Sequence, residues 1–281
     1  ALYNVFEWDF RKPETRKVMA GRECRQFQVT TGDGGRTWSK PRELTEMLGS
    51  QKFTTVFGSG AGIQLRHGEH AGRLVVPGGF QKPWGNRVFY SDDHGETWKV
   101  GERAPRQQVK NNNVRLECKV AELSDGSLVL NARCTPHRAR AFSKDGGVTW
   151  TPLEIDPQLP AVSCNGSLVC VRDGKGRDVL LLSVPTGPKR THGTVYASLD
   201  GGRTWPNKKT LVDGTFAYSS LVQLHDGRIA LIYESENHKH LDLEATVVDG
   251  HLEPPPPGLV EQDAGAQRCG LLLPQAVEHH R

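Results

Sequence analysis

The chain contains 281 residues, of which 36% are hydrophobic and 24% charged, and its formal net charge is +4. No apolar run approaches the roughly 18 residues of a membrane-spanning helix, and the lysines and arginines are scattered along the sequence. We therefore expect a soluble globular protein with no membrane span and no nucleic-acid partner. The first residues contain no basic segment followed by an apolar one, so the chain as given shows no signal peptide. Secreted, lysosomal and cytosolic locations all remain open.

The cysteines form no CxxC pair, and their wide spacing fits no zinc signature. They are Cys24, Cys118, Cys134, Cys164, Cys170 and Cys269. Free buried thiols are the expected state, since disulfides would need an oxidising compartment that the sequence does not establish. One sequon, Asn165-Gly166-Ser167, would matter only in a secretory pathway.

One eight-residue motif, the Asp-box, recurs four times along the chain. It has the form [S/T]-x-D-x-G-x-T-W and occupies residues 31–38, 91–98, 143–150 and 198–205. The repeats are roughly 50 to 60 residues apart, a period that suits the four-stranded blade of a β-propeller.

The residue types of the motif indicate a self-capped hairpin. Its Asp can accept hydrogen bonds from backbone N–H groups of its own turn, and a Gly two residues later can take a positive φ. The Thr-Trp pair then begins the next strand, and the indole can cover the edge of the blade or the gap to its neighbour. Such a motif identifies architecture and not activity.

The segments between the boxes predict short strands. Apolar or alternating runs bounded by turn residues occur at 72–80, 125–134, 178–184 and 226–234. No stretch of ten or more residues shows helical periodicity. The expected fold class is therefore all-β.

The chain resembles the sialidase (neuraminidase) superfamily, whose fold is a six-bladed β-propeller. Beyond the four boxes, short stretches of the family pattern occur in the expected order between about residues 22 and 250. They are 58–65 with 72–77, 117–123 with 131–133, 164–167, 217–221 and 231–234. The resemblance implies an exo-α-sialidase that removes terminal sialic acids from glycoproteins, gangliosides or oligosaccharides without a cofactor or a metal.

The resemblance also assigns roles to five residues. Tyr218 is the expected nucleophile and Glu117 the base that activates it, while Arg133 and Arg190 belong to the cluster that binds the substrate carboxylate, and Glu234 orients an arginine of the site. Guanidinium groups bind carboxylates bidentately, and a neutral phenol is not repelled by the anionic reaction centre. A phenol has a pKa near 10, so a carboxylate must accept its proton during attack.

Each assignment has a structural alternative. Arg133 and Arg190 could be ordinary surface or ion-pair residues, and the segment around Arg190 permits another register. Tyr218 could be a core tyrosine of a strand, and Glu117 has a similar alternative. Glu234 could be a surface charge at the end of a strand.

The sequence departs from the family pattern at both ends. The R-I-P stretch with the first arginine and the mobile aspartate that acts as general acid are not found; Arg11 lies in no matching context, and Asp9 and Glu14 are left unassigned. We expect residues 1–252 to form four to five blades of an N-terminally incomplete propeller, and the Pro-rich residues 253–281 to form an irregular tail.

Turnover by this chain is expected to be weak or absent, because the first arginine and the general acid are missing from the sequence. A non-catalytic propeller that binds a sialoglycan or a protein is the alternative, and trans-sialylation is not distinguished from hydrolysis.

Overall fold

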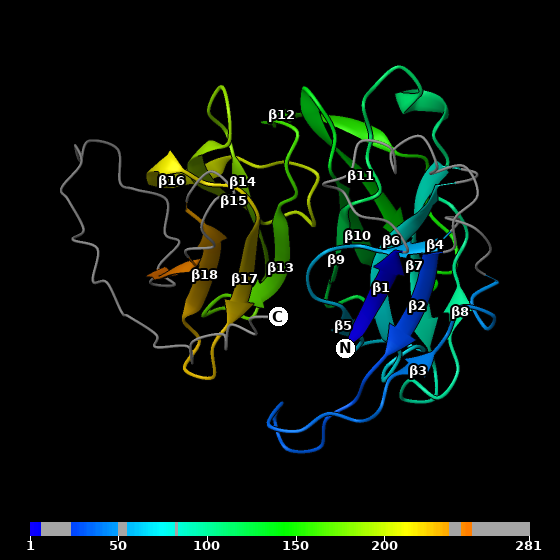
Figure 1. Ribbon diagram of the computed structural model, residues 1–281. Helices are drawn as coiled ribbons and strands as arrows, with labels where there is room; N and C mark the ends of the chain where they lie inside the picture. The colour runs from blue at the N-terminus through cyan, green and yellow to red at the C-terminus, as the bar shows by residue number, and fades with distance from the viewer. Residues whose placement is uncertain (7–23, 50–54, 82–83, 236–242, 249–281) are drawn as a thin grey trace, which may run out of the picture.

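The computed structural model describes residues 1–6, 24–49, 55–81, 84–235 and 243–248, and its strands form five sheets that follow one another along the chain (Figure 1). The strands in each sheet pair in antiparallel fashion with their neighbours. Among these residues there is no α-helix, and one 3-10 turn, η1, spans Gln107–Val109. The all-β propeller fold expected from the sequence is confirmed, with five sheets described.

Each sheet is one blade. The first contains β1 (Leu2–Phe6), β2 (Cys24–Gln28) and β3 (Arg42–Glu43). The second contains β4 (Thr55–Phe57), β5 (Ile63–Gln64), β6 (Leu74–Gln81), β7 (Trp84–Ser91) and β8 (Lys99–Val100). The third contains β9 (Cys118–Glu122), β10 (Leu128–Ala132), β11 (His137–Ser143) and β12 (Glu154–Pro160). The fourth contains β13 (Ser167–Arg172), β14 (Asp178–Pro185), β15 (Thr191–Ser198) and β16 (Asn207–Thr215). The fifth contains β17 (Ser219–Gln223), β18 (Ile229–Glu234) and β19 (Leu243–Val248).

The predicted strands coincide with β6, β10, β14 and β18 within a few residues at their ends. The five blades lie within the predicted propeller domain 1–252. Residues 253–281 and the segment with Asp9, Arg11 and Glu14 lie outside the described residues. The domain boundary therefore stays a prediction.

The Asp-boxes form the turns that precede the last strands of the first four blades, before β3, β8, β12 and β16. In the second box, Asp93 accepts hydrogen bonds from the backbone N–H of Thr97 (2.8 Å) and from its hydroxyl (2.5 Å), while Ser91 accepts one from Gly95 N–H (2.8 Å). Gly95 has a φ of 94° and so needs the freedom of glycine. The self-capped turn predicted from the sequence is confirmed.

Three of the four tryptophans of the boxes are buried in the seams between blades. Trp98, Trp150 and Trp205 are buried, whereas Trp38 of the first box is 51% exposed. Two of the indoles reach back to the preceding blade: Trp98 Nε1 donates to Gln28 at 2.8 Å and Trp205 Nε1 donates to Asp156 at 3.0 Å. Burying such a ring removes roughly 150–250 Å² from water, which contributes about 4–6 kcal/mol before entropic costs.

Arginines tie the third and fourth boxes to the blades before them. Arg73 of the second blade donates to the carbonyls of Asp145 (3.2 Å) and Gly146 (3.1 Å) in the third box. Arg140 of the third blade donates to the carbonyls of Gly202 (2.8 Å) and Arg203 (2.7 Å) in the fourth. These bonds connect residues more than sixty positions apart and fix the angle between neighbouring blades.

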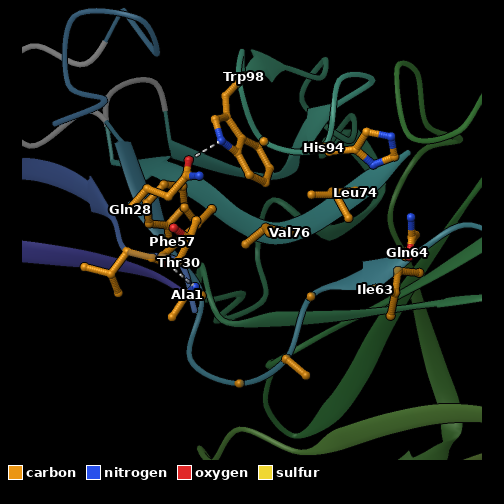
Figure 2. A pocket seen from close by; sticks show the side chains of 17 residues that line it. Ala1, Gln28, Thr30, Phe57, Ile63, Gln64, Leu74, Val76, His94 and Trp98 are labelled. Carbon is orange, nitrogen blue, oxygen red and sulfur yellow. Dashed lines mark hydrogen bonds between the residues drawn. The ribbon is translucent and has the colours of Figure 1, made fainter. Parts of the chain in front are cut away.

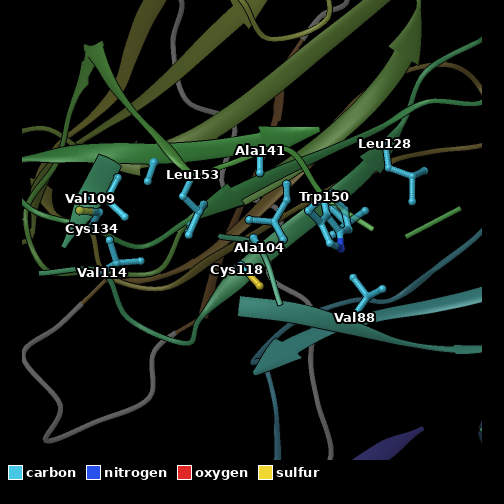
Figure 3. Close-up of a cluster of buried hydrophobic side chains, with 14 of the residues drawn as sticks. Val88, Ala104, Val109, Val114, Cys118, Leu128, Cys134, Ala141, Trp150 and Leu153 are labelled. Atoms are coloured by element: carbon cyan, nitrogen blue, oxygen red, sulfur yellow. The ribbon is translucent and has the colours of Figure 1, made fainter. Parts of the chain in front are cut away.

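The apolar core is divided among the seams. The largest cluster joins the second and third blades and contains Val88, Leu128, Leu130, Trp150 and Leu153, all buried (Figure 3). A second cluster joins the third and fourth blades, and a third joins the fourth and fifth. Each seam is held by its own core, so the inner strands keep fixed positions relative to one another.

A cavity of about 520 Å³ lies between the first and second blades (Figure 2). Its lining includes Phe57, Leu74, Val76 and the edge of the buried Trp98, beside the Gln28 side chain. None of the five residues assigned to the site from the sequence lines this cavity.

Candidate active site

The five candidate residues lie at strand ends on one side of the blades. Glu117 directly precedes β9, Arg190 precedes β15 and Tyr218 precedes β17, whereas Arg133 follows β10 and Glu234 ends β18. Because neighbouring strands are antiparallel, the start of one strand and the end of the next meet at the same sheet edge. Strands β9, β13 and β17 are neighbours across the blades, so this edge converges on the centre of the ring. The Asp-boxes occupy the opposite edge.

Tyr218, Glu117 and Arg133 form one hydrogen-bonded group. The Tyr218 hydroxyl donates to Glu117 Oε1 at 2.5 Å. Arg133 Nη1 donates to Glu117 Oε1 (2.8 Å) and Oε2 (2.6 Å) and to the Tyr218 hydroxyl oxygen (3.1 Å). The Arg133 side chain is 14% exposed and that of Glu117 is 26% exposed, so the ion pair is partly shielded from water. Charge-assisted bonds of this kind hold the three groups in one geometry.

The environment keeps the Tyr218 phenol protonated. Burial raises the pKa of Tyr218 to about 12, helped by the hydrogen bond to Glu117 and by the charge of that carboxylate, while the charge of Arg133 acts in the opposite direction. The phenol is therefore neutral at neutral pH and can react as a nucleophile only if its proton is removed during attack. Glu117 Oε1 already accepts that proton in a short hydrogen bond.

Arg190 approaches the same tyrosine from the fourth blade. Its guanidinium carbon lies 5.3 Å from the centroid of the Tyr218 ring. Its Nη2 donates to the backbone carbonyl of Ser163 at 3.1 Å. Arg133 contacts the hydroxyl of the same tyrosine, so two guanidinium groups lie next to one phenol.

Glu234 lies beside the main chain of Tyr218. Its Oε2 accepts a long hydrogen bond from the Tyr218 N–H (3.4 Å), and its own backbone N–H donates to the Tyr218 carbonyl (2.9 Å). Glu234 therefore contacts the main chain of Tyr218, the candidate nucleophile. Its predicted role of orienting an arginine stays a prediction.

Two buried cations, Lys119 and Arg138, lie on strands next to the candidate residues in the chain. Lys119 is 5% exposed and donates to the carbonyl of Ser59, and burial lowers its pKa to about 8. Arg138 is fully buried, donates to Asn131 Oδ1 (2.7 Å) and to the Cys164 carbonyl (2.9 Å), and has its pKa lowered to about 10 chiefly by burial. Lys119 has an electrostatic interaction with Glu117 that raises the pKa of the lysine, against the larger effect of burial.

The cysteines with described side chains, Cys118, Cys134, Cys164 and Cys170, are free, as expected, and the first three are buried. Asn165 of the sequon is 3% exposed and donates its amide to the hydroxyl of Ser59 at 2.8 Å. In the folded protein this amide is therefore not accessible for glycosylation.

No motif of the sequence indicated Ser163, although this residue contacts both arginines of the site. Its hydroxyl accepts from Arg133, and its carbonyl accepts from Arg190. It directly precedes the family-like stretch 164–167, and that position is the one feature that could have drawn attention to it. Lys119 and Arg138 were missed as well, because their burial depends on the packing of several blades.

This chain matches only part of the length of its relatives of known sequence. Residues 11–231 match the model of the BNR repeat-like domain family. A sialidase from Micromonospora viridifaciens is 35% identical over 223 residues, which are 73% of this chain and 33% of that protein. Sialidase-2 of Cricetulus griseus is 33% identical over 248 residues, which are 77% of this chain and 63% of that protein. The chain thus spans between a third and just under two thirds of these relatives.

Solved structures with the same fold include a sialidase and a trans-sialidase. The Hadza microbial sialidase Hz136 superposes with a TM-score of 0.65 at 32% identity, covering 75% of this chain and 42% of that one. The intramolecular trans-sialidase from Ruminococcus gnavus, solved with oseltamivir carboxylate, gives 0.64 at 27% identity, covering 76% and 47%. Among the described residues of the present chain, no helix is long and apolar enough to cross a membrane. The domain match and these relatives show that the chain belongs to the sialidase superfamily.

Proposed function

We propose that the chain carries the catalytic chemistry of an exo-α-sialidase, a retaining glycoside hydrolase that acts on terminal sialic acids of glycoconjugates. The observation that carries the proposal is the 2.5 Å hydrogen bond from the Tyr218 hydroxyl to Glu117, with Arg133 donating to both groups. Relatives named sialidases support the substrate class.

The charges of the site suit this substrate. Sialic acid carries a carboxylate on its anomeric carbon, and Arg133 and Arg190 both lie next to the phenol that would attack that carbon. A carboxylate nucleophile would be repelled by the anionic centre, whereas the phenol of Tyr218, with a pKa of about 12, is neutral.

Two displacements complete the reaction. In the first, the Tyr218 oxygen bonds to the anomeric carbon, its proton passes to Glu117, and the bond to the leaving group breaks. In the second, water or another hydroxyl attacks the same carbon and releases its proton to the solvent, while the C2–O bond to Tyr218 breaks and the Tyr218 oxygen recovers the proton held by Glu117. Two inversions at one carbon give net retention of configuration.

An aryl α-sialoside with a nitrophenolate leaving group tests this proposal, because such a group departs without protonation. We expect release of nitrophenol, a loss of about 10³-fold in Tyr218→Phe, and an unchanged rate in Tyr196→Phe, which makes the same substitution in the core of the fourth blade. Proton NMR should show the α-anomer of sialic acid first, or an anhydro product if transfer is intramolecular.

Undiminished release by Tyr218→Phe would refute the assignment of the nucleophile. If the wild-type chain binds an unsaturated sialic acid analogue and releases no nitrophenol, the hydrolase proposal fails and a sialoside-binding propeller remains.

A further inference from the structure

Ser163 lies on the connection between the third and fourth blades and contacts an arginine of each. Its hydroxyl oxygen accepts hydrogen bonds from Arg133 Nη2 (2.8 Å) and Nε (3.3 Å). Its backbone carbonyl accepts from Arg190 Nη2 (3.1 Å). One residue therefore touches both guanidinium groups that are assigned to the substrate carboxylate.

The hydroxyl fixes one edge of the Arg133 guanidinium. Nε and Nη2 of this group face Ser163, while Nη1 faces Glu117 and Tyr218. Bidentate recognition of a carboxylate depends on the plane in which the guanidinium donors lie. Because Ser163 already holds one edge of the Arg133 guanidinium, that side chain loses less conformational entropy when a ligand binds. Ser163 thus sets the plane of Arg133 before a ligand arrives.

The segment that carries Ser163 is itself firmly held. The N–H of Ala161 donates to the Pro136 carbonyl of the third blade (2.9 Å), and the N–H of Cys164 donates back to the Val162 carbonyl (2.6 Å). The fully buried Arg138 donates to the Cys164 carbonyl (2.9 Å). Because hydrogen bonds restrain the chain on both sides of Ser163, the position of Ser163 itself is restricted.

We propose that Ser163 is a positioning residue that couples Arg133 to Arg190 and sets the spacing of the carboxylate-binding pair. This role rests on the proposed sialidase function, since it presumes a carboxylate between the two arginines. Ser163 acts through the arginines and not on the reacting atoms. Its loss should weaken the recognition of a carboxylate and leave other contacts with the sugar unchanged.

The test compares binding of 2,3-unsaturated N-acetylneuraminic acid and of its methyl ester, which lacks the negative charge. Ser163→Ala should weaken binding of the acid by about tenfold and leave binding of the ester unchanged, and Ser163→Thr, which keeps the hydroxyl, should retain wild-type affinity for the acid. Ser183→Ala serves as the matched control, because the Ser183 hydroxyl contacts Ser219 (2.8 Å) and neither arginine.

Ser163→Cys, which keeps the shape of the side chain with a slightly larger atom that is a weak acceptor, replaces Ser163→Ala if the alanine variant does not fold. Equal affinity of wild type and Ser163→Ala for the acid would overturn the positioning role while the proposed function stands. Equal losses for acid and ester would also overturn it, since they would indicate a general distortion of the site. Absence of binding by the wild-type chain would overturn the proposed function and, with it, this inference.

Discussion

The hydroxyl of Tyr218 donates a 2.5 Å hydrogen bond to Oε1 of Glu117, although 101 positions separate the two residues in the chain. Tyr218 stands before the first strand of the fifth blade and Glu117 before the first strand of the third. The convergence of inner strands at one edge of the ring brings them together. Most of the chemistry proposed for this site depends on that single contact.

Replacing Glu117 by Gln should lower the pKa of Tyr218 from about 12 toward the ordinary tyrosine value. The negative charge of Glu117 raises this pKa, and the substitution removes it. Burial and the opposing charge of Arg133 remain. A tyrosinate absorbance titration, with the curve of Tyr218→Phe subtracted, measures the change. A Tyr218 pKa that stays at about 12 in Glu117→Gln would show that the carboxylate has no influence on the phenol.

The stability of the protein should fall between about pH 10 and pH 12 more steeply in the wild type than in Tyr218→Phe. The folded-state pKa of Tyr218 is about 12, and that of an unfolded tyrosine is about 10. Across this interval the unfolded chain loses the phenolic proton while the folded chain keeps it, so the free energy of unfolding decreases as pH rises. Urea unfolding at several alkaline pH values gives the difference, and parallel curves for the two proteins would contradict it.

Two tryptophans of the Asp-boxes should differ sharply in their contribution to stability. Trp98 is 6% exposed and bonded to Gln28, so Trp98→Ala should lower the free energy of unfolding by about 3–5 kcal/mol. Trp38 is 51% exposed, and Trp38→Ala should cost less than about 1 kcal/mol. Urea denaturation of both variants measures the contrast. Similar losses in the free energy of unfolding would mean that Trp38 is buried to the same degree as Trp98.

The thiols near the site should resist alkylation in the folded protein. Cys118 and Cys164 are buried, and burial raises the pKa of each to about 11, so very little thiolate exists at neutral pH. We expect iodoacetamide to leave both unmodified in buffer and to modify both in urea, as peptide mass mapping would show. Rapid modification of Cys164 without urea would contradict the fixed geometry of the connection that carries Ser163.

The sequence predicted the blade architecture because an Asp-box is a local motif, whose turn bonds join residues two to four positions apart. The site residues Glu117, Arg133 and Tyr218 were found because each lies in a short family-like stretch, and the structure brings the three together. The contact of Ser163 with two arginines could not be predicted in this way. It joins residues 27 and 30 positions apart, and its geometry depends on how two blades pack.

The first displacement offers the most direct test of the proposed function. With a 2,3-difluorinated sialic acid, the C2–F bond breaks, fluoride leaves without protonation, the Tyr218 oxygen bonds to C2, and Glu117 takes the phenolic proton. Mass spectrometry should find one fluorosialyl group on the peptide that contains Tyr218, more slowly formed in Glu117→Gln and absent in Tyr218→Phe. A wild-type chain that stays unmodified, or a label that persists in Tyr218→Phe, would contradict the account.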